Sequence, residues 1–292
     1  MSTTGAERVQ RLLHAADESA WSAAALVLGL GRTSSTELGR AAADVLRAMD
    51  VDVPAEDLDR AGAAAQAAAP LLQTAALLRG DADLWGGQSD EALLAQGRTS
   101  AQGAALFARH VFPALTGLTD ALGRPGARML DVGTGVAALA VAYAELFPSL
   151  TVVGIDVLPR ALALAASTRA GSTAGDRVLL REQDVATVDE TGAYTLAWLP
   201  APFVPEEPLR AGVARIGRAL VPGGWLVMGH GRYTGDPVAD AISRFKTVAF
   251  GGTALDDAQA ARLLGDTGLV DVRNVATPPG APALTAGRRP AL

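Results

Sequence analysis

The hydrophobic pattern of the chain changes near residue 123. Before this point apolar residues recur at the three- and four-residue spacing of helices, and after it short apolar runs alternate with helical stretches. The two patterns meet at the linker Gly123-Arg124-Pro125-Gly126, which has the composition of a turn. We therefore expect a helical domain at residues 1–122 and an α/β domain at residues 123–292.

The first part of the chain predicts a series of helices. The first covers residues 6–30, with helical spacing of Val9, Leu12, Leu13, Ala16, Ala20 and Ala24. Its apolar run at 23–30 is far shorter than the ~20 residues that cross a bilayer, so we expect no membrane contact. A second helix begins at Ser34 or Ser35 and ends at Met49. Alanine-rich helix follows at 54–79, interrupted at Pro70, and further helices are expected around 91–94 and at 102–122.

The second part of the chain alternates between the two patterns. Apolar runs predict strands at 129–132, 151–155, 177–182 and 193–200, and another after the turn Val221-Pro222-Gly223-Gly224. Helices are expected at 137–146, from Leu158 onward, and at 208–220, 237–250 and 254–264. Two extended segments, 269–276 and 283–288, are joined through Pro278-Pro279-Gly280. Strands that alternate with helices are typical of an α/β fold with a parallel sheet.

Composition and charge narrow the functional classes. The 292 residues include no cysteine, which excludes disulfides, zinc-thiolate sites and a cysteine nucleophile. A net charge of −6 argues against a nucleic-acid partner, because a phosphate backbone requires a basic surface. We expect no metal site. The first apolar run lacks the cleavage pattern of a secretory signal, so we expect a cytoplasmic protein.

The candidate chemistry centres on the strand at 129–132 and the turn that follows it. Asp131 lies near the carboxyl end of this strand. On either side of Thr134, Gly133 and Gly135 permit a tight turn and allow a ligand to approach the backbone closely. The helix that begins at Ala137 directs free N–H groups toward the same crevice. This arrangement predicts a nucleotide site.

The segment Leu130-Asp131-Val132-Gly133-Thr134-Gly135 resembles the first motif of class I S-adenosylmethionine-dependent methyltransferases. The sequence departs from the family pattern at Ala137, where a third glycine is usual. The resemblance covers about residues 126–289. It implies a Rossmann-like, doubly wound, mostly parallel seven-stranded sheet with an antiparallel last strand, preceded by the helical region.

The same turn leaves a second interpretation open. Gly133-Thr134-Gly135-Val136-Ala137-Ala138 also satisfies the dinucleotide pattern G-x-G-x-x-G/A. The alternative function is therefore an NAD-binding oxidoreductase or a noncatalytic nucleotide-binding module. Asp184, which follows the third strand, and the late start of the α/β fold favour the methyltransferase. Its cofactor would be S-adenosyl-L-methionine.

Asp156 is the second predicted cofactor residue, because it ends the strand that follows the glycine turn. An ionised carboxylate can accept hydrogen bonds from both hydroxyls of a ribose, and it would repel the 2′-phosphate of NADP. The alternative is that Asp156 only caps the helix that begins near Leu158.

A third carboxylate lies at the end of the next strand. The resemblance implies that Asp184 accepts from the adenine amino group while the N–H of Val185 donates to a ring nitrogen. Val157 would supply an apolar face for the base, and Trp198, on the fourth strand, is included among the cofactor contacts. Asp184 can also be read as a solvated turn residue.

The acceptor is expected to be a small molecule. Leu199-Pro200-Ala201-Pro202 lacks the leading polar residue with which amine-methylating relatives of this family hold a nucleobase, so DNA is disfavoured. We favour O-methylation over N- or C-methylation, in secondary metabolism. His230 is the candidate general base, since it ends the fifth strand and its reference pKa is near 6.5. A loop histidine bonded to backbone is the alternative.

The remaining predictions concern the acceptor pocket and the oligomer. Aromatic and histidine side chains on the helical region, or on loops at strand ends, are the candidate pocket residues: Trp85, His110, Phe203 and Tyr233. Each of them could instead be a packing residue. The alanine-rich helices are suited to close helix contacts, and we expect a homodimer through the helical region.

Overall fold

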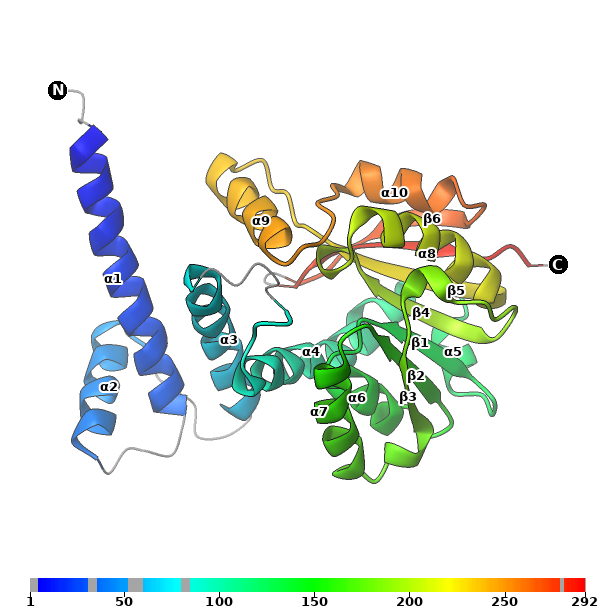
Figure 1. Ribbon diagram of the computed structural model, residues 1–292, viewed down its shortest axis with the longest axis horizontal. Helices are drawn as coiled ribbons and strands as arrows, with labels where there is room; N and C mark the ends of the chain where they lie inside the picture. The colour runs from blue at the N-terminus through cyan, green and yellow to red at the C-terminus, as the bar shows by residue number, and fades with distance from the viewer. Residues whose placement is uncertain (1–4, 31–35, 52–59, 80–84, 279–280, 292) are drawn as a thin grey trace. The chain divides into compact units, whose positions relative to one another are not determined.

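The computed structural model describes residues 5–30, 36–51, 60–79, 85–278 and 281–291. The chain divides into two compact units, Met1–Gly80 and Asp81–Leu292 (Figure 1). The first unit is helical, and the second contains the sheet.

The helical unit consists of α1 (Gly5–Leu30), α2 (Glu37–Ala48) and α3 (Arg60–Leu78). Thr36 caps α2, because its hydroxyl accepts from Gly39 N at 3.0 Å. The predicted start at Ser34 or Ser35, and residues 54–59 of the third predicted helix, lie outside the described residues. Pro70 lies inside α3, so the predicted interruption is wrong. Alanine and leucine on both sides favour helix strongly enough to tolerate one missing backbone hydrogen bond.

By length and composition alone, α3 is apolar enough to cross a membrane. Core helices of soluble proteins share this property. The predicted lack of membrane contact therefore stays a prediction.

The second unit is built on a seven-stranded sheet with the order β3-β2-β1-β4-β5-β7-β6. Pairings from β3 through β5 are parallel, and β7 is antiparallel to both of its neighbours. The predicted fold class is confirmed. The strands are β1 (Arg128–Val132), β2 (Thr151–Asp156), β3 (Val178–Glu182), β4 (Tyr194–Pro200), β5 (Leu220–His230), β6 (Val270–Val275) and β7 (Ala283–Arg288). The predicted turn at Val221–Gly224 is part of β5, beside an irregularity in the register of β4 and β5. Residues 279–280 of the predicted hairpin turn lie outside the described residues.

Helices cover both faces of this sheet (Figure 1). One apolar core holds residues of α4, α5, α6 and α7 against β1, β2 and β4, and the other holds residues of α8 and α10. The helices are α4 (Asp90–His110), α5 (Leu118–Leu122), α6 (Ala138–Leu146), α7 (Pro159–Ala170), α8 (Glu206–Ala219), α9 (Pro237–Ala249) and α10 (Asp257–Gly265). Short 3-10 turns are η1 (Phe112–Ala114), η2 (Gly175–Arg177), η3 (Val185–Thr187) and η4 (Ala201–Phe203).

The helices α4 and α5 and the turn η1, which precede the linker, pack with the sheet. The two helices expected around 91–94 and 102–122 are instead one long α4, the turn η1 and the short α5. Phe107, Phe112 and Leu118 are buried in the core that lies against β1 and β4. The compact units therefore divide at Gly80 and Asp81, whereas the sequence placed the domain boundary after residue 122. Apolar faces on these helices are completed only by the sheet, which local sequence pattern does not reveal.

Candidate active site

The glycine turn after β1 leaves open space above its backbone. Gly133 and Gly135 have φ values of +65° and +55°, a conformation that disfavours side chains. A Cβ atom at Gly135 would meet only the Gly133 carbonyl oxygen, at 4.0 Å, and one at Gly133 would meet Pro200 Cγ at 3.8 Å. A ligand can therefore lie directly on this backbone.

Ala137 occupies the position of the missing third glycine. Its φ of +59° is unusual for a residue with a side chain, and it is fully buried as the N-cap of α6. The Ala137 N–H donates to the Thr134 carbonyl at 2.8 Å, which closes the turn. The turn thus has the geometry of the glycine pattern, although one glycine is replaced.

Asp156 joins the end of β2 to the glycine turn. Its Oδ2 accepts from Gly135 N at 2.7 Å and its Oδ1 accepts from Leu158 N at 2.9 Å. Burial raises the pKa of this carboxyl, while the backbone N–H groups act in the opposite direction. The bond to Leu158 N lies just before α7, whose N-cap Leu158 has no side-chain capping bond, so Asp156 does not cap this helix. Each oxygen keeps a further lone pair, so the predicted ribose contacts are compatible with this arrangement.

Asp131 is buried beside the same turn. Its Oδ2 accepts from Thr134 Oγ1 at 2.7 Å, and its side chain is almost inaccessible to solvent. Burial raises the pKa of Asp131 to about 7; the Thr134 hydrogen bond opposes this shift and the nearby Asp156 adds to it. A carboxyl that ionises near neutral pH therefore lies below the turn. A cation bound in the crevice would favour its ionised form.

The third predicted cofactor contact lies at the end of β3. Asp184 caps η3, because its Oδ1 accepts from Ala186 N at 2.8 Å. The Val185 side chain is buried against Gly212 of α8, so only its backbone can face a ligand. Val157, next to Asp156, is exposed and is free to cover an adenine ring. These positions are compatible with the predicted roles, which stay predictions.

Trp198 lies on the same face of the sheet as Asp131. The two residues are register partners in the parallel pair of β1 and β4. The indole packs at 5.3 Å from the Phe107 ring, and a Cβ atom at Gly229 would come within 2.7 Å of it. Trp198 is thus held in the core that supports the crevice, and its predicted cofactor contact is untested.

Two of the predicted pocket residues come together. The Trp85 ring lies 5.2 Å from both Phe203 and Phe250, and these two phenylalanine rings are 5.1 Å apart. All three side chains are partly exposed. Phe203 follows β4 and Phe250 follows α9, so the cluster forms an aromatic wall beside the carboxyl ends of β4 and β5.

The other two predicted pocket residues lie outside this cluster. His110 ends α4 and is exposed, about 30 Å along the helix from Asp90, because a helix rises ~1.5 Å per residue. The structure shows no contact between His110 and the other predicted pocket residues that it describes, and its place in the pocket stays a prediction. Tyr233 lies near Gly231, where a Cβ atom would come within 3.0 Å of its ring.

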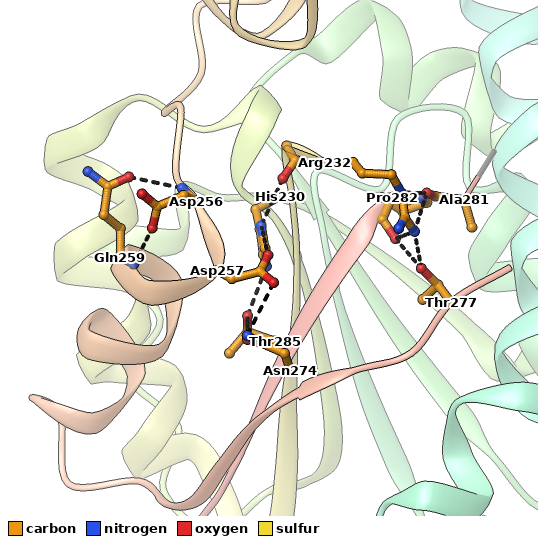
Figure 2. A network of polar contacts seen from close by, with 11 residues as sticks. His230, Arg232, Asp256, Asp257, Gln259, Asn274, Thr277, Ala281, Pro282 and Thr285 are labelled. Atoms are coloured by element: carbon orange, nitrogen blue, oxygen red, sulfur yellow. Dashed lines mark hydrogen bonds and ion pairs between the residues drawn. The ribbon is translucent and has the colours of Figure 1, made fainter. Parts of the chain in front are cut away.

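His230 is buried in a network on the α10 side of the sheet (Figure 2). Its Nε2 lies 2.8 Å from Thr285 Oγ1, and its Nδ1 lies 3.1 Å from the Gly231 carbonyl and 3.9 Å from Asp257 Oδ1. The network continues from Thr285 through Asn274 to Asp257. Burial lowers the pKa of His230. Both ring nitrogens lie close to protein atoms, so His230 links β5, β7 and α10, and its role as general base stays a prediction.

A cavity of about 230 Å³ lies between α8 and α10. Its lining includes Arg210, Thr253 and Arg262, and it includes none of the predicted site residues. The glycine turn, with its open backbone and two carboxyls, is the better candidate site. Among the residues that the structure describes, no cluster of histidine and acidic side chains could hold a metal ion.

Residues 129–224 match the family described as a methyltransferase domain. The match begins in β1, includes the glycine turn and all three carboxyls, and ends in β5. The chain contains a class I methyltransferase domain. The predicted class, that of S-adenosylmethionine-dependent methyltransferases, is confirmed, and S-adenosylmethionine is the cofactor of this class. No curated protein matches the chain.

Solved structures similar to this methyltransferase cover nearly its whole length. An O-methyltransferase family protein from Burkholderia thailandensis has a TM-score of 0.65 at 16% identity and covers 99% of each chain. Human N-acetylserotonin methyltransferase, in complex with SAM, has a TM-score of 0.64 at 13% identity, covering 99% of this chain and 100% of its own. The mitomycin 7-O-methyltransferase MmcR has a TM-score of 0.60 at 18% identity, with 97% and 98% covered. At these identities the likeness shows the fold.

Sequence reasoning did not single out two residues near predicted site residues, Phe250 beside Trp85 and Gln88 three residues after it. Phe250 completes the aromatic wall, but the last residue after an amphipathic helix has no distinctive pattern. Gln88 precedes Ser89, which caps α4 by accepting from Ala92 N at 3.2 Å. The segment Ser89-Asp90-Glu91 is a helix-start signal that could have placed Gln88 directly before a helix.

Proposed function

We propose that this methyltransferase transfers the methyl group of S-adenosylmethionine to a small-molecule acceptor, with an oxygen nucleophile favoured over nitrogen or carbon. The observation that carries the proposal is the open glycine turn bonded to Asp156, next to an aromatic wall at the end of β4. The names of two similar structures, both O-methyltransferases, support the choice of oxygen. The mitomycin enzyme's name supports a role in secondary metabolism.

Each cofactor residue has a role in this proposal. Asp156 binds the ribose diol, Gly133 and Gly135 allow the ligand to lie against the backbone, and Asp184 with the N–H of Val185 binds the adenine. Asp131, through Thr134 or a water, favours the positive charge of the ligand. Trp198 supports the crevice from the face below.

The chemistry requires placement more than acid–base assistance. When bound, S-adenosylmethionine supplies a methyl group on a sulfonium sulfur, so the acceptor attacks in line and the carbon–sulfur bond breaks with its electron pair passing to sulfur. The aromatic wall of Trp85, Phe203 and Phe250 holds the acceptor at its apolar surface. Proximity at ~3–3.5 Å can supply most of the acceleration. Because His230 faces protein atoms, we propose an acceptor hydroxyl acidic enough to lose its proton without this histidine.

Calorimetry with three ligands tests the cofactor. Wild-type protein should bind S-adenosylmethionine and S-adenosylhomocysteine and should not bind NAD. Binding of NAD alone would contradict the proposal and restore the oxidoreductase alternative. A panel of phenols, alcohols, amines and carbon acids, assayed by release of S-adenosylhomocysteine, then tests the acceptor. Turnover confined to amines or carbon acids would contradict the preference for oxygen.

The helical unit supports the proposed homodimer. Residues 5–21 of α1 are all exposed, and its apolar stripe includes Val9, Leu12 and Leu13, exposed by 54%, 69% and 59%. Light scattering should show a wild-type dimer, a monomer for Leu13→Glu and a dimer for the control Arg11→Glu, which changes the opposite face of α1. A monomeric wild type would contradict the proposal. We also propose a cytoplasmic protein without nucleic-acid partners, in line with its net charge of −6.

A further inference from the structure

The short segment Trp85–Asp90 is held at both ends within the sheet unit. At one end, the Trp85 ring packs 5.2 Å from Phe203 and Phe250. At the other end, Arg160 Nη1 donates to the Gln88 carbonyl at 2.7 Å, and Arg160 Nε donates to Asp90 Oδ1 at 2.9 Å. We call this segment the strap.

The two anchors place the strap over the glycine turn. Arg160 lies in the first turn of α7, directly after β2, and Phe203 lies in η4, directly after β4. In the sheet, β1 lies between β2 and β4. A segment that joins the two anchors therefore crosses the carboxyl end of β1. The helix that follows the strap is fixed there as well, since a Cβ atom at Gly97 of α4 would overlap the Val136 side chain.

The strap carries two buried hydrogen-bond donors without a partner. The Gln88 side chain is 1% exposed and its Nε2 makes no hydrogen bond, and the Trp85 Nε1 is also buried and unpaired. Buried donors are nearly always paired, because burial without a partner costs free energy. Two such donors on one segment above an open turn indicate that a ligand supplies the acceptors.

We propose that Gln88 is a cofactor-binding residue whose Nε2 donates a hydrogen bond to the nucleoside part of S-adenosylmethionine. The proposal rests on the proposed function of the glycine turn. Arg160, which holds the Gln88 backbone, is four residues after Asp156, the proposed ribose ligand. Gln88 therefore belongs to the ribose and adenine side of the crevice. Trp85 lies at the other anchor, as part of the aromatic wall.

The test replaces Gln88 with methionine, which has nearly the same shape and no donor. Calorimetry uses S-adenosylhomocysteine and 5′-methylthioadenosine, which keeps the nucleoside and lacks the amino acid. Loss of one neutral hydrogen bond should weaken both ligands by the same factor, about three- to tenfold. Gln66→Met, an exposed glutamine of α3, is the matched control and should change neither affinity.

Thermal unfolding of the ligand-free protein separates binding from structure. Gln88→Met removes a buried unpaired donor, so the melting temperature of the ligand-free variant should stay equal to that of wild type or rise. A lower melting temperature, or affinities within about twofold of wild type for both ligands, would overturn the role of Gln88. A loss for S-adenosylhomocysteine alone would overturn the assignment to the nucleoside. If wild type binds neither ligand, the proposed function itself fails, and this inference fails with it.

Discussion

Replacing Asp131 with asparagine should make the protein more stable at neutral and alkaline pH. The carboxyl is buried, and its pKa is raised from 3.8 to about 7 by that burial. Between these two values the folded chain binds more protons than the unfolded chain, so unfolding becomes easier as the pH rises. The loss of unfolding free energy caused by the buried charge is complete once the pH exceeds about 7. Asparagine keeps an oxygen that can accept from Thr134 Oγ1 and carries no charge to bury.

The magnitude follows from the size of the pKa change. A pKa raised from 3.8 to about 7 corresponds to a free energy on the order of 4 kcal/mol. The unfolding free energy of Asp131→Asn should therefore equal that of wild type near pH 4 and exceed it by up to about 4 kcal/mol above pH 7. Urea unfolding at pH 5.5, 6.5, 7.5 and 8.5 gives the difference directly. Asp120→Asn, at an exposed carboxyl of α5, controls for the loss of one charge.

The affinity of the wild-type protein for the cofactor should rise with pH, whereas its stability should fall. The sulfonium and ammonium groups of S-adenosylmethionine favour an ionised Asp131, so wild-type affinity should rise with pH and level off above about 7. Asp131→Asn should bind more weakly at pH 8 and show a smaller dependence on pH. The reasoning is refuted if the stability difference between the two proteins is constant across this range, or if the asparagine variant is the less stable protein at pH 8.5.

Three further substitutions, one of them with a matched control, test separate residues. Asp156→Ala should weaken the binding of S-adenosylmethionine by about 1.5–3 kcal/mol in calorimetry, because hydrogen bonds to a charged group are lost. Unchanged affinity in a folded variant would mean that another carboxylate binds the ribose. Gly135→Ala and its control Gly126→Ala should each lower the unfolding free energy by about 1–2 kcal/mol in urea, because φ is +55° and +82° at these glycines. Only Gly135→Ala should also bind the cofactor more weakly. Equal affinities of the two variants would show that the turn does not contact the ligand. His230→Ala should lower the melting temperature, because the hydrogen bond between the imidazole and Thr285 Oγ1 is lost and only the bond from Thr285 to Asn274 remains. The kcat of the folded variant should change less than about threefold, and a hundredfold loss would restore the general base.

Several features of the site follow from local sequence. Apolar runs bounded by glycine predict the buried strands β1 and β2, and the glycines at 133 and 135 predict a turn that a ligand can approach. Parallel strands carry their carboxyl ends at one edge, so Asp131, Asp156 and Asp184 could be assigned to one crevice. These inferences need only periodicity within a strand and the backbone preferences of single residues.

Other features depend on contacts between segments that are distant in sequence. Periodicity placed His230 at the end of β5 but could not show that Thr285, 55 residues later, would lie against its imidazole. It also could not show that α4 would be completed by the sheet. Sheet order places Arg160 and Phe203 on either side of β1, and only this order brings Gln88 over the glycine turn. The sequence thus determined the elements and the turn chemistry, whereas tertiary structure decided burial and partners, because these depend on apolar faces that distant segments complete.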